Sequence, residues 1–185
     1  MRRKDGMRLT NWHIITGAPC SGKTSVIREL ERIGYRVVHE AARAYIDQQL
    51  AEGYRLEQIK TDKLAFENHI LETKLRIEDS LPPDEIIFFD RGIPDSIAYF
   101  KHAGLDTAQP FDMSRRLRYR RVFFFERLGF SKDRVRAEDE KTAQQLGTLI
   151  QESYRMLGYE ILSVPVLSIH RRVEFILERL RIQRS

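Results

Sequence analysis

Residues 17–24 read Gly-Ala-Pro-Cys-Ser-Gly-Lys-Thr, and this stretch decides the fold. It matches the pattern of a phosphate-binding loop, GxxxxGK[ST], at every required position. Glycines let such a backbone wrap closely around an anion, and the helix that follows presents its positive end to the same anion. The residues expected to contact a nucleotide are Gly17, Ala18, Pro19, Cys20, Ser21, Gly22, Lys23, Thr24 and Ser25.

Two side chains of this loop have expected roles. Lys23 can reach the β- and γ-phosphates of ATP, and the Thr24 hydroxyl can bind Mg²⁺. Because Lys23 follows a glycine-rich loop, we expect its ammonium group to be solvated when no nucleotide is bound. The cofactors predicted at this point are therefore ATP and Mg²⁺.

Short apolar segments alternate with helical ones on both sides of the loop. Strands are expected at residues 12–16, 35–39, 86–89, 121–125 and 160–164. Helices are expected at 22–33, 40–51, 55–80 (one or two), 94–103, 138–157 and from 168 onward. This alternation predicts an α/β fold: a five-stranded parallel sheet with helices on both faces. The order 2-3-1-4-5 is what the resemblance to P-loop proteins, described below, implies for these strands. One domain over residues 12–185 is expected, preceded by a basic extension over 1–11.

The composition excludes several classes of protein. The chain has 185 residues, a net charge of +5 and a single cysteine, so no internal disulfide framework is possible. Its longest apolar runs are too short to cross a bilayer. The basic start is not followed by an apolar segment, so no secretory signal is expected. These features predict a cytoplasmic location.

A second carboxylate is expected where the strand at 86–89 ends. Asp90 lies there and can orient hydrated Mg²⁺, and Arg91 follows it. Motor-type ATPases usually place a glutamate beside this aspartate to activate water, so the arginine argues against that class. The chain also lacks an Asn-Lys-x-Asp motif, which weakens a Ras-like GTPase interpretation and favours ATP.

The Asp90-Arg91 pair, with Glu40 closing the second strand, resembles the thymidylate-kinase and deoxynucleoside-kinase group. The resemblance implies that Glu40 faces an acceptor and that Asp90 and Arg91 face both substrates. Arg43 should lie on the same side of its helix as Glu40. It could bind an acceptor phosphate or carboxylate, or pair with Glu40 or Asp47.

A wider resemblance covers about residues 12–182. The stretches ITGAPCSGKTSVIRELERIGYRVVHEAARAYI, FFDRGIPDSIAYF and DRVRAEDEKTAQQLGTLIQESYRMLGYEI are similar to one P-loop ATPase family. That family is typified by the ribosylnicotinamide-kinase domain of the bacterial NAD regulator and by an animal protein named for a TRPL-channel translocation defect. The resemblance implies nucleotide binding and kinase chemistry, and it does not name an acceptor.

Basic residues cluster in the second half of the chain. Arg134 and Arg136 lie in a segment, about 127–140, expected to close over the phosphates as a lid, where an arginine can stabilise the transferred group. Alternatively, Arg136 pairs only with Glu140. The five arginines within residues 115–121 are interpreted as a solvated helix face. Contact with a nucleic acid or an anionic membrane surface is the functional alternative, with nucleic acid disfavoured because few aromatic residues accompany the arginines, which argues against stacking of single strands.

Two functions are carried forward. In the first, the protein is a kinase that transfers the γ-phosphate of Mg·ATP to an unidentified small molecule, with Glu40 or Asp90 taking the acceptor's proton and Glu40 favoured. Lys23, Arg134 and Arg136 complete the catalytic set, and backbone around residues 164–168 holds the purine. In the second, nucleotide binding gates a protein or lipid partner, and slow hydrolysis resets the switch.

Overall fold

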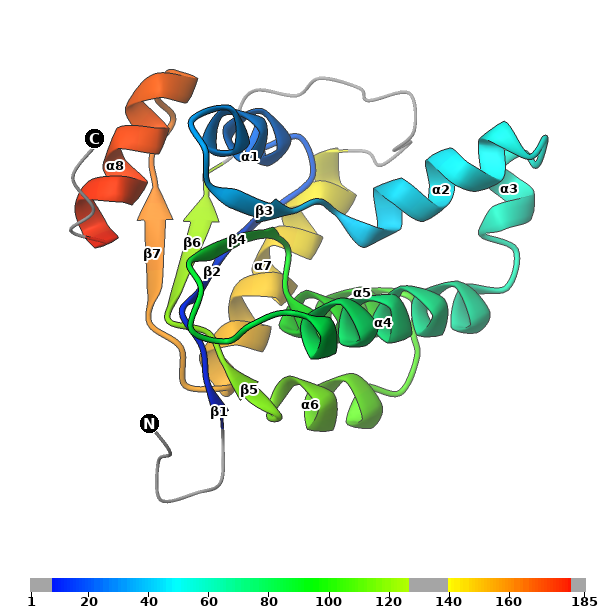
Figure 1. Cartoon of the computed structure of the whole chain (residues 1–185). Helices are drawn as coiled ribbons and strands as arrows, with labels where there is room; N and C mark the ends of the chain where they lie inside the picture. The colour runs from blue at the N-terminus through cyan, green and yellow to red at the C-terminus, as the bar shows by residue number, and fades with distance from the viewer. Residues whose placement is uncertain (1–7, 127–139, 181–185) are drawn as a thin grey trace.

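Five strands form one parallel sheet in the computed structural model, which describes residues 8–126 and 140–180 (Figure 1). Across the sheet the order is β3 (Arg36–Val38), β4 (Ile87–Asp90), β2 (Trp12–Gly17), β6 (Arg121–Phe125) and β7 (Ile161–Val164). Counted along the chain, these are the five expected strands in the order 2-3-1-4-5, and every neighbouring pair is parallel. The predicted architecture is confirmed.

Helices cover both faces of the sheet. They are α1 (Lys23–Arg32), α2 (Ala41–Ala51), α3 (Leu56–Ile59), α4 (Lys63–Ser80), α5 (Ile93–His102), α6 (Ala108–Ser114), α7 (Glu140–Met156) and α8 (Ile169–Leu180). The expected helix at 55–80 is divided in two, because Asp62 caps a new start by accepting a hydrogen bond from the Ala65 amide at 2.9 Å. The helix α6 was not expected. None of the described helices is long and apolar enough to span a membrane.

Successive residues of each central strand enter opposite layers of the core. Ile15 and Phe88 pack with α1 and α8, whereas Ile14 and Phe89 pack with α5 and α7 on the other face. In Figure 1, α1 and α8 accordingly lie on one side of the sheet and α7 on the other. Burial on both faces explains why the central strands read as uninterrupted apolar runs.

A second, two-stranded parallel sheet was not anticipated. It pairs β1 (Arg8–Leu9) with β5 (Leu117–Arg118), so the stretch expected as an N-terminal extension contains a paired strand. The interpretation of residues 115–121 as a helix face is wrong, because α6 ends at Ser114 and β5 follows. Arg118 is also not simply solvated: its guanidinium stacks 3.8 Å from the centre of the Tyr159 ring.

Candidate active site

The phosphate loop joins β2 to α1, and two glycines give it a backbone conformation that other residues rarely adopt. Gly17 has a φ of 141°, and a Cβ placed there would lie 2.7 Å from the carbonyl oxygen of Phe125. Gly22 has a φ of 82°, which L-residues rarely adopt. At the far side, Arg172 of α8 donates from Nη1 to the Ser21 carbonyl at 2.8 Å. The loop is therefore held between a strand and a helix that are distant in sequence.

Lys23 is buried, and the expectation that it is solvated without nucleotide is wrong. The residue is 4% exposed, and its Nζ donates to the Ala18 carbonyl at 2.8 Å and to the Ser21 hydroxyl at 3.1 Å. An ammonium group inside the loop must hydrogen-bond to the loop, because leaving it unpaired would be costly. The loop thus holds its own cation among the backbone groups expected to bind phosphate.

Thr24 and Asp90, the two residues predicted to hold Mg²⁺, meet at the end of the sheet. Asp90 is 2% exposed, and the Thr24 hydroxyl donates to its Oδ2 at 3.3 Å. Hydroxyl and carboxylate oxygens are the hard ligands that Mg²⁺ prefers. This donor set fits Mg²⁺, with Thr24 and Asp90 as the residues that would hold it.

A cavity of about 730 Å³ opens over the loop. Residues 20–25 line it, together with Asp90 from β4 and Glu40, Arg43 and Asp47 from the start of α2. Gly17, Ala18 and Pro19 are buried behind the part of the loop that faces the cavity. The space is open and polar, which suits a charged phosphate chain; we call it the phosphate cavity.

Glu40 and Arg91 form a buried ion pair next to the loop. Glu40 precedes α2 and is 8% exposed, and its Oε1 accepts a hydrogen bond from Arg91 Nε at 3.2 Å. Arg91 Nη1 also donates to the Gly17 carbonyl at 3.0 Å. One guanidinium therefore connects the first residue of the phosphate loop with the carboxylate expected to face the acceptor.

Asp95 fixes that guanidinium, although the sequence alone did not indicate a role for it. Its carboxylate is completely buried and accepts hydrogen bonds from Arg91 Nη1 at 3.1 Å, the Thr16 hydroxyl at 2.5 Å, the Tyr154 hydroxyl at 2.6 Å and the Gly92 amide at 3.0 Å. The sequence does contain a signal for Asp95: it lies in the first turn of a helix, one helical turn after Arg91. The network explains how Arg91 tolerates a positive φ of 73°.

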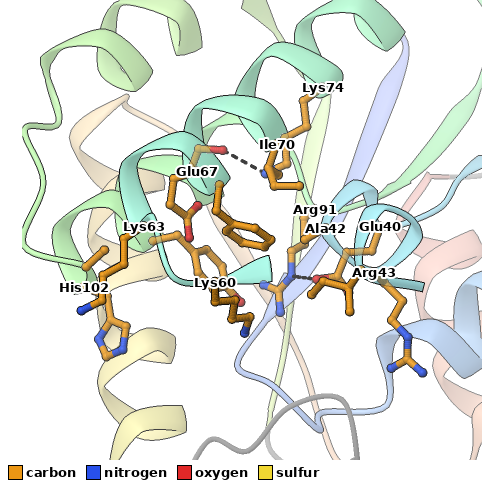
Figure 2. A pocket seen from close by; sticks show the side chains of 15 residues that line it. Glu40, Ala42, Arg43, Lys60, Lys63, Glu67, Ile70, Lys74, Arg91 and His102 are labelled. Carbon is orange, nitrogen blue, oxygen red and sulfur yellow. Dashed lines mark hydrogen bonds and ion pairs between the residues drawn. The ribbon is translucent and has the colours of Figure 1, made fainter. Parts of the chain in front are cut away.

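A second cavity, of about 270 Å³, lies between α2, α4 and α5 (Figure 2). Its walls include the apolar side chains Ile46, Phe66, Ile70 and Tyr99. Glu40 and Arg43 line this cavity and the phosphate cavity alike, so the two spaces meet at the start of α2. We call this space the acceptor cavity.

Two buried charged side chains lie on α4, and one of them, Lys74, lines the acceptor cavity. Lys74 of α4 donates from Nζ to the Gly92 carbonyl and to the Ser96 hydroxyl, both at 3.0 Å, and burial lowers the pKa of its ammonium group. One turn further along α4, burial raises the pKa of Glu78 to about 7, although the Tyr119 hydroxyl donates to its Oε1 at 2.5 Å. These groups were not recognised in the sequence.

The remaining predicted residues are placed as follows. Arg43 donates from Nε to both carboxylate oxygens of Asp47, at 3.0 and 3.1 Å, while also lining both cavities. Arg91, predicted to contact the acceptor, lines the acceptor cavity. Arg134 and Arg136 lie outside the described residues, as does most of the expected lid, so the lid remains a prediction.

Comparison with known families gives a direct match. The model of a family described as an AAA domain matches residues 12–172, which include the phosphate loop, Asp90 and both cavities. The chain belongs to this family. No curated protein matches the chain.

Several solved structures share the fold of this AAA domain. A deoxyadenosine kinase from M. mycoides, with products dCMP and dCDP bound, has a TM-score of 0.63 and 18% identity, covering 92% of this chain and 98% of that one. A thymidylate kinase from Ehrlichia chaffeensis has a TM-score of 0.65 and 13% identity over the same shares. The NadR protein in complex with NR has a TM-score of 0.70 and 16% identity; 97% of this chain is covered, but only 53% of NadR. This chain therefore spans about half of NadR's length.

Proposed function

We propose that the protein is a cytoplasmic kinase that uses Mg·ATP to phosphorylate a hydroxyl of a small, nucleoside-like or nucleotide-like molecule. The observation that carries the proposal is the position of Glu40. Its buried carboxylate lines both the phosphate cavity and the acceptor cavity and is paired with Arg91, which is bonded to the phosphate loop. A second, largely apolar space beside the phosphate site is what a transferase needs and a simple hydrolase does not.

The residues divide the reaction between them. The acceptor's hydroxyl oxygen forms a bond to the γ-phosphorus, and the bond from that phosphorus to the bridging oxygen breaks, which releases ADP. The hydroxyl proton passes to the Glu40 carboxylate, acting as general base. Lys23 and the loop amides stabilise charge on the phosphates, and Arg91 holds Glu40 beside the loop. When bound at Thr24 and Asp90, Mg²⁺ neutralises part of the phosphate charge.

Glu40 is preferred to Asp90 as the base because their surroundings differ. Asp90 accepts a hydrogen bond from the Thr24 hydroxyl and, with Thr24, forms the pair of ligands that fits Mg²⁺. Its carboxylate oxygens would therefore be occupied by the metal. Glu40 borders the space where an acceptor would lie. Arg134 and Arg136 are proposed as lid residues that stabilise the transferred group.

The names of the structural neighbours support the substrate class. Deoxyadenosine kinase, thymidylate kinase and NadR bound to NR share this fold over most of the chain. Because their sequence identities to this chain are low, these comparisons establish a shared fold and nothing further. The acceptor class therefore rests on the combination of that fold with a cavity of compact size between α2, α4 and α5.

The test is a screen for acceptor-dependent ADP release. Purified protein with Mg·ATP is offered nucleosides, nucleotides and vitamin-like alcohols, and products are checked by mass spectrometry for a gain of one phosphate. We expect at least one acceptor to raise ADP release well above the background and to appear phosphorylated. Slow hydrolysis that no acceptor changes would contradict the proposal and favour the nucleotide-gated switch.

A further inference from the structure

The acceptor cavity is apolar along its walls. Ile46 of α2 and Ile70 of α4 are each 4% exposed, and Phe66 and Tyr99 add aromatic rings. Apolar and aromatic walls around about 270 Å³ fit a compact body of low polarity, such as a single ring. The polar ends of the cavity must then determine which groups the ring carries.

One end of the cavity is the reacting end. There Glu40 and Arg43 border the phosphate cavity as well. A hydroxyl placed at this end would lie beside the proposed general base. The acceptor's orientation follows: its hydroxyl points toward Glu40, and the remainder of the molecule extends toward α4 and α5.

Basic side chains line the cavity away from that end. Lys60 and Lys63 flank the cap of α4, and His102 is the last residue of α5. In Figure 2, Lys63 and His102 lie on one side of the pocket and Glu40 and Arg43 on the other. Lys60 Nζ lies 5.9 Å from the centre of the Phe66 ring, so an ammonium group is held against the aromatic wall.

These lysines have no carboxylate partner of their own within the described ranges 8–126 and 140–180. Glu67 also lines the cavity, but the basic side chains there outnumber the two carboxylates, Glu40 and Glu67. Lys60 is half-buried against the aromatic wall, so its ammonium group gains from an anion placed next to it, because fewer water molecules can solvate it there. Lys63 is exposed and adds a second positive charge beside it. The excess of positive charge also attracts anions toward the opening.

We propose that the acceptor is a ring-bearing alcohol with an anionic substituent on the ring, bound by Lys60 and Lys63 at the end away from its reacting hydroxyl. This inference rests on the proposed kinase function and deepens it. The hydroxyl lies beside Glu40, the ring lies between the apolar walls, and the anion lies beside the two ammonium groups.

The experiment uses acceptors in matched acid and amide or unsubstituted pairs. The probes are nicotinate riboside against nicotinamide riboside, orotidine against uridine, and 4-(hydroxymethyl)benzoate against its carboxamide. Acceptor-dependent ADP release with Mg·ATP gives kcat/KM for each. In any pair that is turned over, we expect the acid to be preferred by about 10-fold or more, the scale of a charge-assisted contact.

Three variants separate recognition from general effects. Lys60→Gln and Lys63→Gln should each lower kcat/KM for the acid about 5- to 10-fold, mainly through KM, and leave the uncharged partner within about 2-fold. Lys101→Gln is the matched control, because it removes a positive charge from α5 at an exposed side chain that pairs with Glu152 and does not line the cavity. It should change neither acceptor.

The outcomes distinguish this inference from the kinase proposal. Equal or better turnover of the uncharged partner would overturn the inference and leave the kinase proposal standing. Equal losses for both partners in the lysine variants would also overturn it, because the lysines would then act on structure alone. If no member of any pair nor any acceptor of the wider screen is phosphorylated, the kinase proposal fails and the inference fails with it.

Discussion

The phosphate cavity and the acceptor cavity share Glu40 and Arg43 but are built in different ways. The first is built around one continuous loop, whose shape depends on glycine backbone at Gly17 and Gly22, and is completed by β4 and the start of α2. The second is made by side chains from three helices, α2, α4 and α5, that the chain brings together from distant positions. A site made from backbone tolerates little change in sequence, whereas a site made from side chains on helices can be altered residue by residue without loss of the fold.

The largest expected effect is on the loop. Lys23→Ala should lower turnover of ATP by about 10²- to 10³-fold, the scale of losing a preorganised charge donor. It should also cost some stability, because the Ala18 carbonyl and Ser21 hydroxyl lose their buried donor. ADP release measures the turnover, calorimetry measures the affinity for nucleotide, and thermal unfolding followed by circular dichroism measures the stability. Unchanged nucleotide affinity in a folded variant would remove the loop from the phosphate site.

The next effect tests whether the two cavities have separate roles. Glu40→Gln keeps the shape of the side chain and removes its charge and basicity, so acceptor-dependent turnover should fall by about 10²-fold while ATP affinity stays within a few-fold. Glu52→Gln, at the exposed other end of α2, is the control and should change neither. If Glu40→Gln weakens ATP binding as much as Asp90→Asn does, Glu40 belongs to the metal site.

The buried carboxyl group of Glu78 predicts that the stability of the protein depends on pH. Burial raises the pKa of Glu78 to about 7 from 4.5 when unfolded, so folding favours its protonated form. This contribution is complete below about pH 4.5 and is lost as the pH rises through about 7, a change of about 3 kcal/mol in the free energy of unfolding. The neighbouring charges are those of Lys74, Arg116 and Asp79.

Chemical denaturation of Glu78→Gln across pH 4 to 8 measures that contribution by its difference from the unchanged protein. Glu72→Gln, at an exposed position of the same helix, is the control. The Glu78→Gln profile should lack the decline between pH 4.5 and 7. A profile parallel to that of the unchanged protein would show that Glu78 keeps an ordinary pKa.

The smallest effect concerns the metal. Asp90→Asn should weaken ATP binding by about 10-fold when Mg²⁺ is present, because a carboxylate is replaced by a neutral amide at the site that fits the ion. When EDTA removes Mg²⁺, the two proteins should bind ATP alike. A deficit of the same size in EDTA would assign Asp90 to the loop's structure and not to the metal.

Much of the fold was predictable because its signals are local. Apolar runs such as Phe88–Phe89 follow from burial on both faces, and glycines mark where the backbone must turn. The position of Asp90 followed from the same signals, whereas the strand order followed from the resemblance to P-loop proteins. The division at Asp62 and the helix α6 were less visible, since short helices depend on tertiary contacts more than on propensity.

The side-chain part of the site was predictable only in part. Glu40 and Arg91 were found from their places at strand ends, but the acceptor cavity combines Ile46, Phe66 and Tyr99, which no spacing in the sequence relates. The buried state of Lys23 was missed because the loop's inward-facing carbonyl at Ala18 cannot be inferred from residue types. Asp95 had a local signal, its position one turn after Arg91, yet its four partners come from several elements.

In the proposed kinase, Arg91 would connect the binding of the two substrates. Its guanidinium is bonded to the Gly17 carbonyl and to Glu40, so a nucleotide that moved the loop would act on the carboxylate at the acceptor's end. Thermodynamic linkage makes such an influence reciprocal: whatever factor ATP applies to acceptor affinity, the acceptor applies to ATP. Coupling of this kind would favour the loading of both substrates together and so disfavour transfer of phosphate to water.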